Sequence, residues 1–429
     1  MAQLSRSVLC RIFHGKAFLF LYFTLIAADV QAEALSLTLE QARDLAERNN
    51  PALSQARAEI DASEGQRQDA RAFLYNNPTA FTTLTRRQSP GASSGDWSLG
   101  IEQPVELAGQ PRLRRNMSDS NLAAVRASIE SLRRSLYAEV ERRFLQVQAV
   151  QTRLATEQEA LELIERSAGI VRSRVEAGED TRLEGNLATV EVGRMRNQLD
   201  RLAEERIRAQ SELATLLQLP SNALPDASGD LNAIPISYTL QALLTSGQNR
   251  PVLAALAHRE ESNRNRLELE RAARYPDLTI GVLTAREGPA NARDSIAGLT
   301  FSLPLPLFKR NAAGIGRAYA DLTQTQIERG AAERDVRAGI VSLWERLSKL
   351  AARLQRLNTS VLPRLDENMR LAQISYKSGE ISISELLLAT RQVIDARRDI
   401  VDAMVEHELT RVSLEETAGW TTQRAPKQP

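Results

Sequence analysis

The chain has 429 residues, with 55 Lys and Arg against 54 Asp and Glu, and its formal net charge is +1. This near-neutral balance excludes a nucleic-acid-binding polycation and an acidic tail. The composition, 42% hydrophobic and 25% charged, is that of a folded protein and excludes an intrinsically disordered one.

The first predicted element is a targeting segment. Three basic residues precede the apolar run Ala17–Ala28, which has the length of the hydrophobic region of a secretion signal. Small residues at 30–32 form a cleavage site, so we expect a signal peptide over residues 1–32. An uncleaved signal that anchors the chain is the alternative. Cleavage would also remove Cys10, the chain's one cysteine, and would leave a mature protein without disulfides.

The remaining chain repeats itself at an offset of about 200 residues. The strongest recurrence is a glycine with two following glutamates: Gly178, Glu179 and Glu184 recur as Gly379, Glu380 and Glu385. The predicted organisation is a first repeat over 33–220, a linker over 221–237, a second repeat over 238–420 and a tail over 421–429.

Each repeat begins with helices and continues into a β-hairpin. Thr38 and Gln41 form a capping-box pattern, and the helical stretch that follows extends to about Phe73, with a second helix starting at Pro51. The expected strands are 79–85 and 97–103 in the first repeat, with 277–285 and 296–303 in the second. By composition, Gln88–Asp96 and Arg286–Asp294 are loops.

The predicted strands are apolar on one face. Trp97, Leu99 and Ile101 alternate with small or polar residues, as do Leu299 and Phe301 in the second repeat. This pattern suits a barrel wall between lipid and water, and these five residues would face lipid. An ordinary hairpin packed on a helix is the alternative. Four strands cannot close a water-filled barrel and open edges are excluded in lipid, so several copies must share one barrel. Three copies would give twelve strands.

A long helical hairpin follows each pair of strands. Apolar residues from Leu122 to Leu154 recur every three or four positions, which predicts a helix over about 115–177 that turns at Gly178 into a second helix. The second repeat predicts helices over 316–377 and 383–418, with a turn at Gly379 and an irregularity at Pro363. Such helices need neighbours for their apolar faces. They suit a tunnel wall around an axis, or alternatively a secreted coiled-coil structural rod without a pore.

No residue constellation of an enzyme is present. His258 and His407 lack neighbouring ligand residues and are expected at the surface, as are Glu415 and Glu416. We therefore expect no catalytic residue, cofactor or metal site.

Glu184 and Glu385 are the candidate functional residues, because each lies six positions after its turn glycine. If copies surround an axis, a ring of these carboxylates would form a cation-favouring gate. Alternatively, a glutamate in the first turn of a helix is simply favoured by the helix dipole.

These parts, in this order, resemble the TolC-like outer-membrane factor family over about 37–420. The segments at 102–112 and 302–311 are most similar to its heavy-metal-efflux branch, of the cobalt–zinc–cadmium resistance type, although residues 109–111 depart from the branch's usual Gly-Gly-Lys. The residues from Tyr376 to Gly379 and from Ile383 to Glu385 resemble the family's periplasmic tip motif.

The resemblance implies a homotrimer in the outer membrane of a Gram-negative bacterium, with a twelve-stranded β-barrel continued by a periplasmic α-helical tunnel. It implies a passive exit duct for a periplasmic adaptor and an inner-membrane resistance–nodulation–division pump. Divalent heavy-metal cations are the expected cargo; drug efflux and type I secretion are alternatives.

The same resemblance assigns roles to the helical tips. Glu385 stands where related channels place an aspartate at the entrance constriction, and Leu388 stands where some place a second one. The residues expected to dock the adaptor are Gly178, Glu179, Arg182, Gly379 and Glu380.

Overall fold

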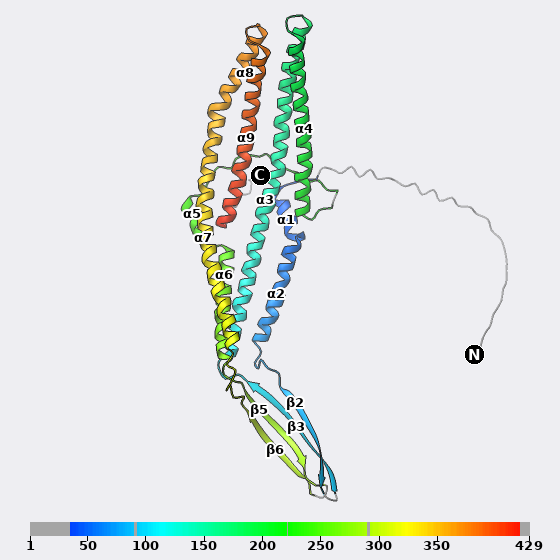
Figure 1. The fold of residues 1–429 in the computed structure, drawn as a ribbon, viewed down its shortest axis with the longest axis vertical. Coiled ribbons are helices and arrows are strands. Elements are labelled where there is room, and N and C mark those ends of the chain that lie inside the picture. The colour runs from blue at the N-terminus through cyan, green and yellow to red at the C-terminus, as the bar shows by residue number, and fades with distance from the viewer. Residues whose placement is uncertain (1–34, 90–91, 221, 290–291, 421–429) are drawn as a thin grey trace, which may run out of the picture.

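A computed structural model describes residues 35–89, 92–220, 222–289 and 292–420. The expected signal peptide over 1–32 and the tail over 421–429 lie outside the described residues. The molecule is long and narrow, with a β-sheet at one end and the turns of two helical hairpins at the other (Figure 1).

The first repeat contains a short helix pair, two strands and two long helices. Thr38 and Gln41 form the expected capping box, and Asn50 caps the next helix, in which Pro51 is the first residue. That helix ends before Phe73. The elements are α1 (Leu39–Asn49), α2 (Pro51–Ala70), β2 (Thr79–Ser89), β3 (Ala92–Val105), α3 (Gln110–Glu176) and α4 (Arg182–Leu216).

The second repeat has the same order, with one irregularity. A single π-helical turn, η1 (Leu357–Val361), ends two residues before Pro363, whose missing N–H cannot take part in an α-helical ladder. The other elements are α5 (Leu240–Gln248), α6 (Pro251–Ala272), β5 (Leu278–Glu287), β6 (Asp294–Ser302), α7 (Ala312–Arg356), α8 (Leu362–Lys377) and α9 (Ile383–Ala418).

The linker between the repeats pairs with the first described residues of the chain. Its strand β4 (Asp226–Ala227) pairs in parallel with β1 (Ser36–Leu37). Asp226 also accepts hydrogen bonds from Arg206 of α4 and Gln151 of α3. The linker is therefore fastened to the first helical hairpin rather than free.

Helix α3 is the longest helix among the described residues and contacts elements of both repeats. It has 67 residues and spans about 100 Å. It starts at Gln110, earlier than the expected residue 115, because Gly109 adopts φ +80° and Pro111 fits the first turn. Its apolar stripe, including Val140, Phe144 and Val147, is buried against α1 and α4. Its opposite side lies against α9, so α3 joins the two helical hairpins.

The strands form one antiparallel sheet in the order β2-β3-β5-β6. The expectation of a loop is wrong for most of Gln88–Asp96, because β2 and β3 extend through it, whereas in Arg286–Asp294 the described residues between Glu287 and Asp294 form a loop as expected. Gln88 pairs with Ser93 and Arg86 with Gly95, because the neighbouring strand supplies backbone partners that outweigh the turn-like composition. The sheet extends beyond the helices, and no helix covers it among the described residues (Figure 1). This excludes hairpins packed on a helix.

Candidate functional site

The two tip turns, residues 177–181 and 378–382, have the same construction. In each, a glycine with positive φ (Gly178, +77°; Gly379, +76°) ends the outgoing helix. The N–H of Glu179 bonds to the carbonyl of Arg174 at 2.9 Å, and that of Glu380 bonds to Ser375 at 2.9 Å. These are Schellman motifs, in which glycine takes the left-handed conformation without strain.

The returning helices start with matching capping boxes. Thr181 Oγ1 accepts from the N–H of Glu184, and the Glu184 carboxylate accepts from the N–H of Thr181 at 2.7 Å. Ser382 and Glu385 repeat the arrangement, with a backbone bond of 2.7 Å. These hydrogen bonds lower the pKa of Glu385 below its ordinary value. Glu184 and Glu385 are therefore capping residues, and their facing toward a pore remains a prediction.

A latch of three residues joins the two tip turns. Tyr376 of α8 is buried and donates its hydroxyl hydrogen bond to the carboxylate of Asp180. Arg174 of α3 donates to Asp180 at 3.1 Å and to the backbone carbonyl of Tyr376 at 3.3 Å. Its guanidinium carbon lies 5.1 Å from the Tyr376 ring centroid. Burial, with the Asp180 hydrogen bond, raises the pKa of Tyr376, so the phenol stays a donor at neutral pH.

Apolar contacts extend the latch along both hairpins. Val171 and Ala188 of the first hairpin are buried with Tyr376, Ile383 and Leu386 of the second. Farther down, Arg391 of α9 pairs with Glu191 of α4 at 3.0 Å. The two tips are thus one packed unit in this conformation.

Arg174, Asp180 and Tyr376 were not predicted as a group from the sequence. The signal that could have found them is a departure from the repeat: their counterparts at the offset of 201 are Ser375, Ile381 and Val175. By contrast, the predicted adaptor-docking residues are all exposed on the tips: Gly178, Glu179, Arg182, Gly379 and Glu380.

The protruding sheet has one predominantly apolar face. Leu99 lies opposite Thr284, Ile101 lies opposite Val282, and Val282 in turn lies opposite Leu299. The side chains predicted to face lipid are all exposed: Trp97, Leu99, Ile101, Leu299 and Phe301. On the opposite face the Phe81 ring lies over Gly100, where a Cβ would come within 2.4 Å of it.

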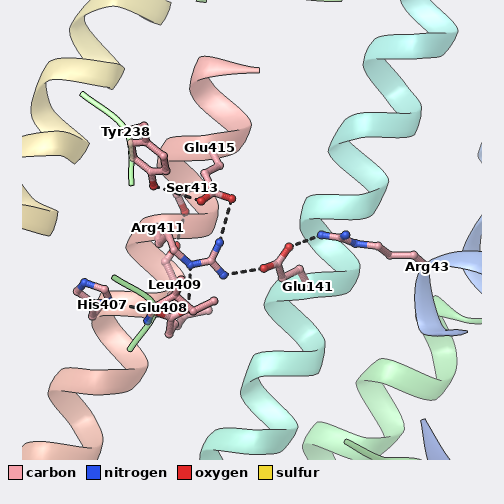
Figure 2. Close-up of polar contacts among 10 residues, drawn as sticks. Arg43, Glu141, Tyr238, His407, Glu408, Leu409, Arg411, Ser413 and Glu415 are labelled. Atoms are coloured by element: carbon pink, nitrogen blue, oxygen red, sulfur yellow. Dashed lines mark hydrogen bonds and ion pairs between the residues drawn. The ribbon is translucent and has the colours of Figure 1, made fainter. Parts of the chain in front are cut away.

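A buried charge cluster fastens the middle of the molecule (Figure 2). Arg411 of α9, only 5% exposed, donates to Glu408 at 2.8 Å, to Glu415 at 2.9 Å and to Glu141 of α3 at 2.8 Å. Arg43 of α1 also binds Glu141. The cluster therefore connects elements from both repeats.

The linker and the first residue of the second repeat complete this cluster. The N–H of Ile234 donates to Glu408 at 2.9 Å, and the Tyr238 hydroxyl donates to Glu415 at 3.2 Å. Burial alone would raise the pKa of Glu408, but the hydrogen bond with His407 and the charge of Arg411 hold it below its ordinary value. Every charge in the cluster has an opposite partner, as burial requires.

The expectation that His407 and Glu415 are solvated is wrong. Both are buried, because α9 turns this face toward α3 and the linker, which sequence periodicity cannot reveal. Glu416 is half-buried and pairs with Arg142 at 2.6 Å. His258 is exposed, as expected.

Within the described ranges, no group of three His, Cys, Asp or Glu side chains is arranged to hold a metal ion. Likewise, no helix in the part of the chain that the structure describes combines the length and apolarity needed to span a membrane.

Comparison with known proteins places this architecture among outer-membrane proteins. A sequence profile described as "Outer membrane efflux protein" matches residues 42–218 and 244–419. These two matched segments correspond to the two repeats.

Two curated relatives carry metal-resistance names. The cobalt-zinc-cadmium resistance protein CzcC of Cupriavidus metallidurans is 28% identical over 365 residues, covering 84% of this chain and 85% of its own. The nickel-cobalt-cadmium resistance protein NccC of Alcaligenes xylosoxydans is 28% identical, covering 71% of this chain and 69% of its own.

The fold is that of a solved outer membrane channel. The crystal structure of the CmeC outer membrane channel of Campylobacter jejuni superposes with a TM-score of 0.74 at 15% identity, covering 89% of this chain and 85% of that one.

Proposed function

Since the chain belongs to the outer membrane efflux protein family, we propose that it is the passive exit duct of a tripartite pump that exports divalent heavy-metal cations. It is an outer membrane efflux channel of a Gram-negative bacterium, of the type found in heavy-metal resistance, and it is not an enzyme. The observation that carries the proposal is the placement of an uncovered apolar-faced sheet on a pair of long helical hairpins (Figure 1).

The duct is a homotrimer in this proposal. The edge strands β2 and β6 are each paired on one side only within the sheet, and lipid cannot satisfy the backbone groups of their outer edges. Three copies pairing β6 with the next β2 would close twelve strands. Exposed apolar residues on α4 and α8 support a further contact between copies near the tips: Leu183, Leu187 and Val190 on one helix, with Leu371 and Ile374 on the other.

The helical end of the duct extends into the periplasm and performs docking and gating. The exposed tip turns at Gly178 and Gly379 would meet the adaptor, with Glu179, Arg182 and Glu380 as polar contacts. Glu184 and Glu385 would form the carboxylate ring at the entrance. The latch around Asp180 would hold the two hairpins together until the adaptor separates them.

The pump supplies the energy and selects the cargo. A proton-driven inner-membrane transporter of the resistance–nodulation–division class would deliver the ion through the adaptor. Relatives named for cobalt, zinc, cadmium and nickel resistance favour divalent cations. Drug efflux and type I secretion are the competing cargo classes.

A deletion experiment tests the cargo. We expect a strain lacking this gene to lose growth on zinc, cobalt or cadmium and to regain it on complementation, with unchanged tolerance of organic drugs. Sensitivity to drugs alone would overturn the metal assignment. Outer-membrane fractions should contain a heat-sensitive trimer, whereas a soluble periplasmic monomer would contradict the duct itself.

A further inference from the structure

The connector Leu303–Arg310, between β6 and α7, is an exposed apolar segment that the fold leaves uncovered. All of its residues are exposed, and Phe308 is 99% exposed. The chain is nevertheless fixed at both ends. Ser302 pairs with Thr279 in the sheet, and Asn311 donates a hydrogen bond of 3.0 Å to the carbonyl of Glu270 in α6. The connector is therefore held in place at both ends while its side chains remain exposed.

The connector continues the apolar sequence of β6 beyond the last paired residue. Apolar residues recur at alternate positions of the sequence, at Leu299, Phe301, Leu303, Leu305 and Leu307, followed by Phe308. The chain turns within this run, where the N–H of Leu307 bonds to the carbonyl of Leu305 at 2.9 Å. Each is between 49% and 99% exposed. The apolar segment that would meet lipid in the proposed function therefore extends past the end of β6 toward the helices.

The corresponding connector of the first repeat, by contrast, makes contacts with the rest of the protein. Pro104 and Val105 are still paired with β5, and Glu106 forms an ion pair with Arg114 at 2.9 Å. The guanidinium carbon of Arg114 also lies 3.5 Å from the ring centroid of Tyr75. The second connector makes none of these contacts, so the asymmetry is specific to residues 303–310.

The chemistry of the connector suits the boundary of a bilayer. Pro304 and Pro306 carry no N–H, which lowers the cost of placing backbone without hydrogen-bond partners near hydrocarbon. Lys309 and Arg310 end the apolar run, and neither has an ion-pair partner among the described residues. Apolar residues followed by cations match acyl chains followed by anionic headgroups.

We propose that Leu303–Arg310 is a membrane-interface anchor, which inserts its leucines and Phe308 into the leaflet on the helical side and pairs Lys309 and Arg310 with anionic phospholipid headgroups. This inference rests on the proposed outer-membrane function. It adds a lipid-binding segment outside the strands, with a stated headgroup chemistry.

Spin labelling of the full-length protein tests the anchor. In a Cys10→Ser background, a nitroxide would be placed at Phe308→Cys, at Leu299→Cys on the sheet and at Glu179→Cys on the tip. The protein would be reconstituted into vesicles of phosphatidylethanolamine and phosphatidylglycerol. Accessibility to oxygen, which partitions into lipid, would be compared with accessibility to a water-soluble nickel chelate.

We expect oxygen to dominate at 308 and 299 and nickel to dominate at 179. Nickel dominance at 308 with oxygen dominance at 299 would overturn the anchor alone. A label at 308 shielded from both reagents would also overturn it, because a second copy of the chain would then cover the segment. Nickel dominance at 299 would contradict the lipid-facing sheet and hence the proposed function.

The headgroup contact has its own test. The double change Lys309→Gln and Arg310→Gln in the Phe308→Cys protein should raise nickel accessibility at 308 in the anionic vesicles. In phosphatidylcholine vesicles the same change should have no effect. Unchanged nickel accessibility at 308 in the anionic vesicles would overturn the pairing of Lys309 and Arg310 with anionic lipid.

Discussion

Tyr376 donates its hydroxyl hydrogen bond to Asp180, which lies 196 positions earlier in the chain, and this contact joins the tip of one helical hairpin to the tip of the other. Tyr376→Phe should open the channel more readily. A hydrogen bond to a charged group contributes about 1.5–3 kcal/mol, or roughly 10–150-fold in the equilibrium between joined and separated tips. Single-channel conductance in planar bilayers measures the change. Tyr319→Phe, at an exposed position of α7, is the matched control. Equal open probability in both variants would show that the hydrogen bond from Tyr376 does not hold the two tips together.

Substitutions at the two capping glutamates can distinguish the effect of their charge from the effect of helix capping. Glutamine also completes a capping box, so Glu184→Gln with Glu385→Gln should keep the tips folded while removing the charge. We expect this double variant to lose cation selectivity, as measured by reversal potentials under a salt gradient. The alanine pair should in addition fray the first turns of α4 and α9. Retained selectivity in the glutamine pair would exclude the carboxylate ring.

The buried cluster predicts a large cost for removing its cation. Arg411→Met leaves three buried carboxylates, Glu141, Glu408 and Glu415, without their shared partner and should destabilise the channel by about 3–5 kcal/mol. Arg370→Met breaks an exposed pair with Glu367, which water screens, and should leave the stability of the channel nearly unchanged. Denaturant unfolding of the purified protein measures both variants, and a similar loss of stability in the two would contradict a stabilising role of the buried charge cluster.

The same cluster predicts a dependence of stability on pH. The pKa of Glu408 is lower in the folded protein than its ordinary value of 4.5, so its ionised form stabilises the fold above that value. This stabilisation should disappear as the pH falls through the lowered pKa. Glu408→Gln should flatten the fall of the unfolding midpoint between neutral pH and about pH 3. Glu261→Gln, at an exposed glutamate of α6, should leave the slope as in the parent protein.

Two glycines of β3 provide a matched pair for the sheet. Gly100→Ala places a Cβ 2.4 Å from the Phe81 ring and 3.0 Å from the carbonyl oxygen of Val282, so it should lower the thermal midpoint of the β-structure. A Cβ at Gly95 meets nothing within 4 Å. Gly95→Ala should therefore be close to neutral. Circular dichroism on heating measures both variants, and an equal effect would refute close packing at Gly100.

Periodicity in the sequence predicted most of the architecture. The spacing of Val140, Phe144 and Val147 marked the buried stripe of α3, and the alternation around Leu99 marked the apolar sheet face. These features follow from local geometry, since helices and strands repeat their side-chain directions every 3.6 and 2 residues. The extent of β2 and β3 escaped prediction, because cross-strand pairing rather than composition extends them through Gly95.

Local sequence patterns were enough to predict the repeated order of helices, strands and helical hairpins, and the turn residues Gly178 and Gly379. The pairing of the charged residues depends instead on how the helices pack. Arg411 meets Glu141 across 270 positions and Arg174 meets Tyr376 across 202, and no local pattern selects such partners. Burial and pairing depend on which helix faces pack against each other, so the buried charge cluster and the latch form only when the two repeats lie side by side.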